Sequence, residues 1–82
     1  MNDQEKREDV LFMFRTEYQR ATEKFGPFAS YHEGYAVLKE EVEELWDEIK
    51  GQQRNDVLLE KAIQIGAMAM RFIMDLKEDH DE

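Results

Sequence analysis

With 82 residues the chain is long enough for one domain, but a single core of this size is barely self-sufficient and is often completed by oligomerisation. A hydrophobic fraction of 41% excludes a disordered chain, and a net charge of −9 excludes nucleic acid and anionic membranes as partners. The lack of cysteine excludes disulfides and thiolate metal sites, and because no signal-like apolar stretch follows Met1, a cytoplasmic location is expected.

The first predicted element is a helix over about residues 4–25. Its apolar residues recur at spacings of three and four and are Val10, Phe14, Tyr18, Ala21 and Phe25. This spacing places them on one face. Gly26-Pro27 should end the helix, because Gly suits a left-handed C-terminal cap and Pro cannot extend the hydrogen-bond ladder.

A second helix is predicted over residues 31–50. Ser30 and Glu33 have the spacing of a capping box, in which Glu33 reaches back to the cap, and Gly51 stands where a C-terminal cap is expected. The apolar stripe of this helix consists of Tyr35, Leu38, Val42, Leu45, Trp46 and Ile49. Trp46 is expected to pack in the core or in a dimer interface.

A third helix is predicted over residues 57–77, after a tight turn over residues 51–56 in which Asn55 and Asp56 are candidate N-caps. Charged residues interrupt its apolar run, so we reject a membrane span. Small residues on one side (Ala62, Gly66 and Ala69) suit close helix packing, while the opposite side is also apolar. One partner cannot cover both sides, so we predict an all-α, three-helix chain that forms a helical bundle by homo-oligomerisation, as a dimer or tetramer, with a frayed tail over residues 78–82.

The second helix also carries a dense acidic segment. Its six carboxylates are Glu40, Glu41, Glu43, Glu44, Asp47 and Glu48. Like charges three or four residues apart repel each other on a helix, and a divalent cation would turn that repulsion into a binding site. Helical projection places Glu41, Glu44 and Glu48 beside the apolar stripe, whereas the other three point toward solvent. The alternative is a solvated acidic face without a ligand.

These residues carry a family resemblance. Glu40-Glu41-Val42-Glu43-Glu44-Leu45 resembles the Glu-Glu-x-x-Glu signature of the MazG-like nucleoside triphosphate pyrophosphohydrolases, and residues 62–69 resemble the helix that follows it. The resemblance covers about residues 32–76. It implies a helical dimer or higher oligomer that converts (d)NTPs to the monophosphate and pyrophosphate with Mg²⁺ or Mn²⁺. It also implies Glu41 and Glu44 as metal ligands and catalytic candidates, with Glu40 as a further ligand.

The third helix departs from the family pattern. Where the family has Glu-x-x-Asp, this chain aligns Lys61 and Gln64, and Glu60 is displaced by one position, which turns its side chain by about 100°. We therefore hypothesise that the Lys61 ammonium lies against Glu41 or Glu44 and replaces a metal ion as counter-charge. Gln64 can still offer an amide oxygen to a metal, so weakened activity is expected.

Cations that can bind substrate phosphates are Lys39, Lys61 and Arg71, with Arg54 as a further candidate. His32 is expected on the surface and His80 in the tail. Two functions stay open at this point. One is a nucleoside triphosphate pyrophosphohydrolase of reduced activity, and the other is a non-catalytic helical oligomerisation or interaction module.

Overall fold

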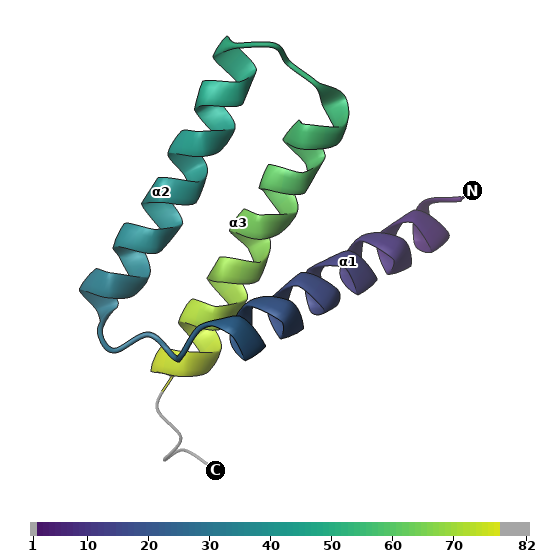
Figure 1. Ribbon diagram of the computed structural model, residues 1–82. Coiled ribbons are helices and arrows are strands. Elements are labelled where there is room, and N and C mark those ends of the chain that lie inside the picture. Colours follow the sequence, from purple (N-terminus) through teal and green to yellow (C-terminus); the bar gives the residue numbers. More distant parts are fainter. Residues whose placement is uncertain (1, 78–82) are drawn as a thin grey trace.

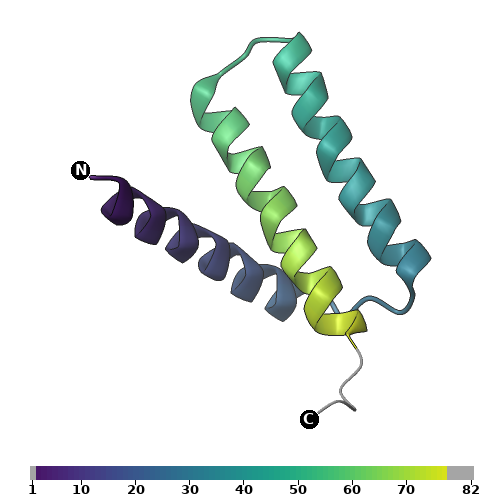
Figure 2. The same cartoon turned by 180° about the vertical axis from the view of Figure 1, so that it is seen from behind.

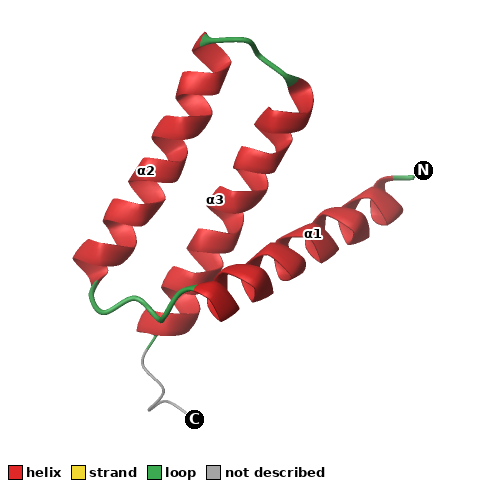
Figure 3. Cartoon of the chain, viewed as in Figure 1, coloured by secondary structure: helices red, strands yellow, loops and turns green. Residues whose placement is uncertain are grey.

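The computed structural model describes residues 2–77 of the chain. It consists of three α-helices, α1 (Asp3–Lys24), α2 (Tyr31–Lys50) and α3 (Asn55–Leu76), with no strand among the described residues (Figure 1 and Figure 3). The all-α prediction is confirmed, and each helix end lies within two residues of its predicted position. The predicted frayed tail, including His80, lies outside the described residues.

Helix α3 lies at the centre, as predicted. It forms an antiparallel hairpin with α2 and packs on its other side against α1, whereas α1 and α2 do not pack against each other within residues 2–77. Both views place α3 between the other two helices, and the N-terminal half of α1 diverges from the hairpin (Figure 1 and Figure 2). The Cα radius of gyration is 14.3 Å, larger than the roughly 11.7 Å expected for a compact chain of this length.

Two glycines allow the helices to approach closely. A Cβ atom at Gly66 of α3 would collide with the ring of Phe14 on α1, and a Cβ at Gly34 of α2 would collide with Phe72 on α3. The predicted small-residue groove of α3 is thus occupied by α1 at Gly66. These contacts fix which faces of α1 and α2 meet α3.

The buried core is small and lies where the α1–α2 linker crosses α3. It contains Ala21, Phe28, Ala67 and Met68. Arg71 of α3 is also buried, with 4% of its surface exposed. Its guanidinium donates a hydrogen bond to the Gly26 carbonyl (2.6 Å) and stacks 4.4 Å from the centroid of the Phe28 ring. The Asp75 carboxylate lies 4.0 Å from this guanidinium and accepts a hydrogen bond from the Phe28 N–H (3.0 Å), so Arg71 and Asp75 together hold the linker against α3.

Two predicted caps are wrong in their detail. Gly26 is not in the left-handed region, and α1 ends instead at Phe25 in an extended conformation (φ −121°, ψ 149°). The physical reason is Pro27, which disfavours helical geometry in the residue before it. At α2 the Ser30 hydroxyl accepts from the Glu33 N–H as predicted (3.1 Å), but the Glu33 carboxylate accepts from the Ala29 N–H and not from the cap residue.

The start of α3 also differs from the prediction. Asn55 and Asp56 are its first two residues and not its caps, and Arg54 occupies the N-cap position without a side-chain cap bond. Gln53 adopts the left-handed region (φ 55°) and makes the turn, so α3 begins at Asn55, two residues earlier than predicted. Asp56 then lies in the first turn, where its charge interacts favourably with the helix dipole.

The predicted apolar stripe of α2 divides into two parts. Leu38, Leu45 and Ile49 are half-buried, whereas Tyr35, Val42 and Trp46 remain 62%, 48% and 55% exposed. Of the two positions predicted for Trp46, the core of the single chain is excluded, and a dimer interface stays a prediction. In the described part of the chain no helix combines the length and apolarity needed to cross a membrane, in line with the rejection of a span in the third helix.

Candidate functional site

The acidic segment of α2 has the two faces that helical projection predicts. Glu41, Glu44 and Glu48 are half-buried, whereas Glu40, Glu43 and Asp47 are exposed. The first three carboxylates thus lie at the margin of the hairpin with α3, where partial shielding from water strengthens their interactions with nearby charges.

Two of these three marginal carboxylates have cationic partners. The Lys61 ammonium donates a hydrogen bond to the Glu44 carboxylate (2.9 Å), and this bond raises the pKa of Lys61 above its ordinary value. The Arg54 guanidinium lies 3.0 Å from the Glu48 carboxylate and holds the pKa of Glu48 below its ordinary value. The predicted contact of Lys61 with the acidic strip is confirmed, with Glu44 as its partner.

Glu41 is the one of these three marginal carboxylates for which the described residues provide no ion-pair partner. Its Oε1 atom is buried and has no hydrogen-bond partner among the residues that the structure describes. Burial, reinforced by the neighbouring charge of Glu44, raises the pKa of Glu41, and the Lys61 charge only partly opposes this effect. A buried acceptor without a donor costs about 1–3 kcal/mol, so Glu41 is poised to accept a bond from an incoming ligand.

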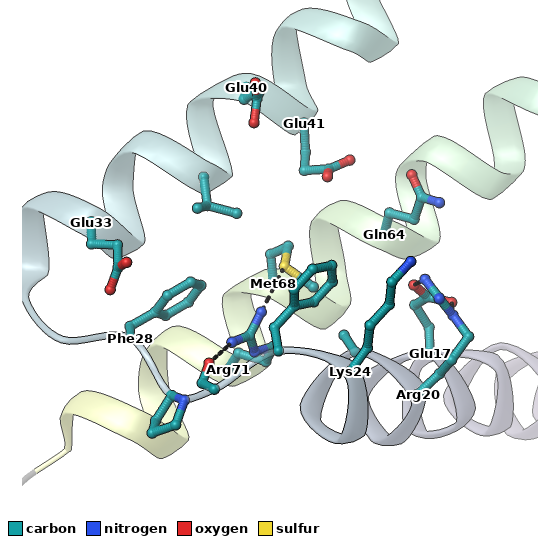
Figure 4. A pocket seen from close by; sticks show the side chains of 15 residues that line it. Glu17, Arg20, Lys24, Phe28, Glu33, Glu40, Glu41, Gln64, Met68 and Arg71 are labelled. Atoms are coloured by element: carbon teal, nitrogen blue, oxygen red, sulfur yellow. Dashed lines mark hydrogen bonds and ion pairs between the residues drawn. The ribbon is translucent and has the colours of Figure 1, made fainter.

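Glu41 lines a cavity of about 630 Å³. The walls come from the C-terminal half of α1, the linker, the first half of α2 and the middle of α3. Glu41 of α2 and Lys24 of α1 point into this space, and Gln64 of α3 lies across from Glu41 (Figure 4). The cavity is electrostatically mixed, with the acids Glu17, Glu33, Glu40 and Glu41 and the cations Arg20, Lys24 and Arg71.

The structure separates the site residues that the sequence predicts. Glu40, Glu41, Gln64 and Arg71 all line the cavity. Glu44 and Lys61 lie one helical turn away, outside its lining. Lys39 forms an ion pair with Glu43 (2.9 Å) and borders a separate shallow depression on α2.

The cations contributed by α1 were missed from the sequence. Arg20 and Lys24 are four residues apart and therefore share a helix face. Arg20 is held by two hydrogen bonds to Glu17. The four-residue spacing of Arg20 and Lys24 is visible in the sequence, but only the crossing of α1 over α3 shows that these cations line the same cavity as Glu41.

The donor set limits how a metal ion can bind. Within residues 2–77, no three Asp, Glu or His side chains are grouped closely enough to hold a metal ion by themselves. Mg²⁺ bound together with a triphosphate needs only one or two protein carboxylates, because phosphate oxygens and water complete its octahedron. The unpartnered Glu41 oxygen, with the Gln64 amide opposite, fits that second mode of binding.

Comparisons with protein-family models, with curated proteins and with solved structures found no match. The MazG-like resemblance therefore stays a prediction from the sequence.

Proposed function

We propose that the chain is a nucleoside triphosphate pyrophosphohydrolase of low activity, with its site in the cavity bounded by α1, α2 and α3. The observation that carries this proposal is the buried, unpartnered Oε1 atom of Glu41 at the wall of that cavity. A carboxylate in this state stabilises nothing in the free chain, but it can accept a hydrogen bond from water or bind a cation that arrives with the substrate.

The side chains around the cavity suit a triphosphate. Lys24 and Arg20 can bind phosphate oxygens, since both line the cavity from α1. Bound Mg²⁺ or Mn²⁺ would neutralise the substrate and polarise its phosphoryl oxygens. Glu41, with Glu40 and the Gln64 amide as the other oxygen donors, would hold the metal–triphosphate complex.

In the hydrolytic step, Glu41 orients a water molecule toward the α-phosphorus and accepts its proton. The water oxygen forms the new bond to phosphorus, the bond to the bridging oxygen breaks, and pyrophosphate leaves with both electrons of that bond. Burial raises the pKa of Glu41 in the free chain, which makes its carboxylate a stronger base than an exposed glutamate. The Lys61–Glu44 ion pair supports low activity, because Glu44 must give up its hydrogen bond before it can bind a metal.

The test is pyrophosphate release from a panel of standard and modified (d)NTPs, with Mg²⁺ or Mn²⁺ and then with a chelator. We expect release that depends on the metal and that Glu41→Gln reduces at least about 100-fold. Glu43→Gln is the matched control, because Glu43 is exposed and paired with Lys39. Equal rates for the two variants, or no release from any nucleotide, would contradict the proposal.

One observation favours the alternative of a non-catalytic interaction module. Lys61 already neutralises the carboxylate of Glu44, so the acidic strip of the free chain needs less compensation by a metal. For such a module, Mg²⁺ and a nucleoside triphosphate added together would not change the thermal stability of the chain, whereas binding of their complex to the Glu41 cavity would raise it.

A further inference from the structure

Arg71 lines the cavity, but its guanidinium already has partners within the chain. The side chain is buried, and it donates to the Gly26 carbonyl (2.6 Å) and to the Met68 sulfur (3.6 Å) (Figure 4). Its Nε atom lies 4.0 Å from the Asp75 carboxylate. A phosphate group would have to displace these partners to bind Arg71. This arrangement disfavours the phosphate-binding role that the sequence suggested for Arg71.

Asp75 holds the linker from the next turn of α3. Its Oδ2 atom accepts a hydrogen bond from the Phe28 N–H (3.0 Å), while Arg71 binds the Gly26 carbonyl and stacks on the Phe28 ring. Two opposite charges four residues apart thus bind a donor and an acceptor of one linker segment. Neither of these backbone groups has a backbone partner among the described residues. The pair therefore satisfies polar groups of the linker that would otherwise lack hydrogen bonds.

The linker held in this way is both a wall of the cavity and the continuation of α1. Its residues 25–28 line the cavity together with Lys24, the last residue of α1. Helices α1 and α2 do not pack against each other within residues 2–77, so the position of Lys24 relative to Glu41 depends on how each helix is attached to α3. The bond from Arg71 to Gly26, two residues after Lys24, fixes the end of α1 beside this cation.

We propose that Arg71 and Asp75, here called the linker clamp, are positioning residues that hold Lys24 and Arg20 of α1 toward the cavity that Glu41 faces, and that Arg71 contacts no phosphate. The substrate-binding part of this proposal rests on the proposed function, whereas the attachment of α1 is measurable in the ligand-free chain. The α1 cations would bind phosphates in the ground state and in the transition state alike. Loss of the clamp should therefore raise KM and change kcat little.

Asp75 distinguishes the two possible roles of Arg71. A carboxylate beside a phosphate-binding guanidinium repels the substrate, so Asp75→Ala would lower KM or leave it unchanged if Arg71 bound phosphate. If the pair is a clamp, Asp75→Ala should raise the KM of pyrophosphate release, with Mg²⁺, at least about fivefold and leave kcat within about twofold. Asp75→Asn keeps an oxygen that can accept from the Phe28 N–H and should recover most of this loss. Asp47→Ala is the matched control, because Asp47 is exposed and pairs with Lys50 on α2.

A second measurement needs no nucleotide. The chain has no cysteine, so spin labels can be attached to Thr22→Cys on α1 and Glu43→Cys on α2, both exposed positions, and their distance measured by pulsed electron paramagnetic resonance. Asp75→Ala should shift or broaden this distance distribution. The distribution between Glu43→Cys and Glu60→Cys on α3 should stay unchanged, because the α2–α3 hairpin does not depend on the clamp.

An unchanged α1–α2 distance in Asp75→Ala, or a KM that falls or stays the same, would overturn the clamp. If the parent releases no pyrophosphate, the proposed function fails, and the label distances still decide whether the clamp positions α1.

If Asp75→Ala does not fold, hydrogen exchange in the parent decides. The Phe28 amide donates to Asp75, whereas the Gly26 amide has no acceptor among the residues that the structure describes. After correction for intrinsic rates, the Phe28 amide should exchange at least about tenfold more slowly than the Gly26 amide. Equal rates would show that Asp75 does not hold the linker and would refute the proposal.

Discussion

In the parent chain the free energy of unfolding should depend little on Mg²⁺. Replacing Lys61 should make it depend on Mg²⁺. Lys61→Met removes the ammonium that donates to Glu44 at 2.9 Å while keeping the length of the side chain. Because the Glu44 side chain is 43% exposed, the pair is screened by solvent and its loss should cost about 1 kcal/mol. Glu41 and Glu44 then lie one turn apart on α2 with no lysine between them and α3.

Mg²⁺ should restore that loss in the variant and change the parent little. With a dissociation constant of about 1 mM and about 10 mM Mg²⁺, linkage gives about 1.4 kcal/mol of stabilisation, or a rise in the melting temperature of about 6–11 °C for a domain of this size. The assay is urea and thermal unfolding at one protein concentration, with and without Mg²⁺, against NaCl of matched ionic strength.

Lys39→Met is the control, because Lys39 forms an equally short ion pair with Glu43 on the exposed face of the same helix. It should lose less stability than Lys61→Met and gain nothing specific from Mg²⁺. The reasoning fails if the two lysine variants respond alike, or if Mg²⁺ stabilises the parent as much as it stabilises Lys61→Met.

The other predictions concern the Glu41 carboxylate and the packing around α3. Since its pKa is raised in the folded chain, the folded state holds the proton more tightly than the unfolded state, so Glu41 reduces stability as pH rises through its folded pKa. Glu41→Gln should therefore be more stable than the parent by about 1 kcal/mol at neutral pH. In urea titrations across pH the two curves should converge in acid, and parallel curves would contradict this cause. Gly66→Ala should lower stability by about 1–3 kcal/mol, because the added methyl meets the Phe14 ring. Gly26→Ala meets no atom within 4 Å and should be neutral or slightly stabilising by thermal melt. Arg71→Met should cost about 2–3 kcal/mol in urea unfolding, since it removes the bond to Gly26 and the stacking on Phe28, and a loss below 1 kcal/mol would show that the linker does not depend on it.

The sequence by itself determined the three helices and the half of α2 that faces α3. Spacings of three and four residues decide which side chains share a face, so the contrast between shielded Glu41, Glu44 and Glu48 and their exposed neighbours could be predicted. The contact of Lys61 with this strip was predicted from the family resemblance, which aligns Lys61 with a metal-ligand position of the family. Local cap details were predicted less well, because Pro27 and Gln53 determine the backbone next to Gly26 and Asn55, the residues from which the caps were predicted.

Only the tertiary structure decided how the helices cross. The crossing of α1 over α3 brings Arg20 and Lys24 to the cavity that Glu41 faces, and it leaves Leu11, Phe12 and Met13 uncovered. Helical periodicity fixes the direction of a side chain about its own axis but carries no information on the angle between two axes. That angle is set by close contacts such as Phe14 on Gly66, between residues far apart in the chain.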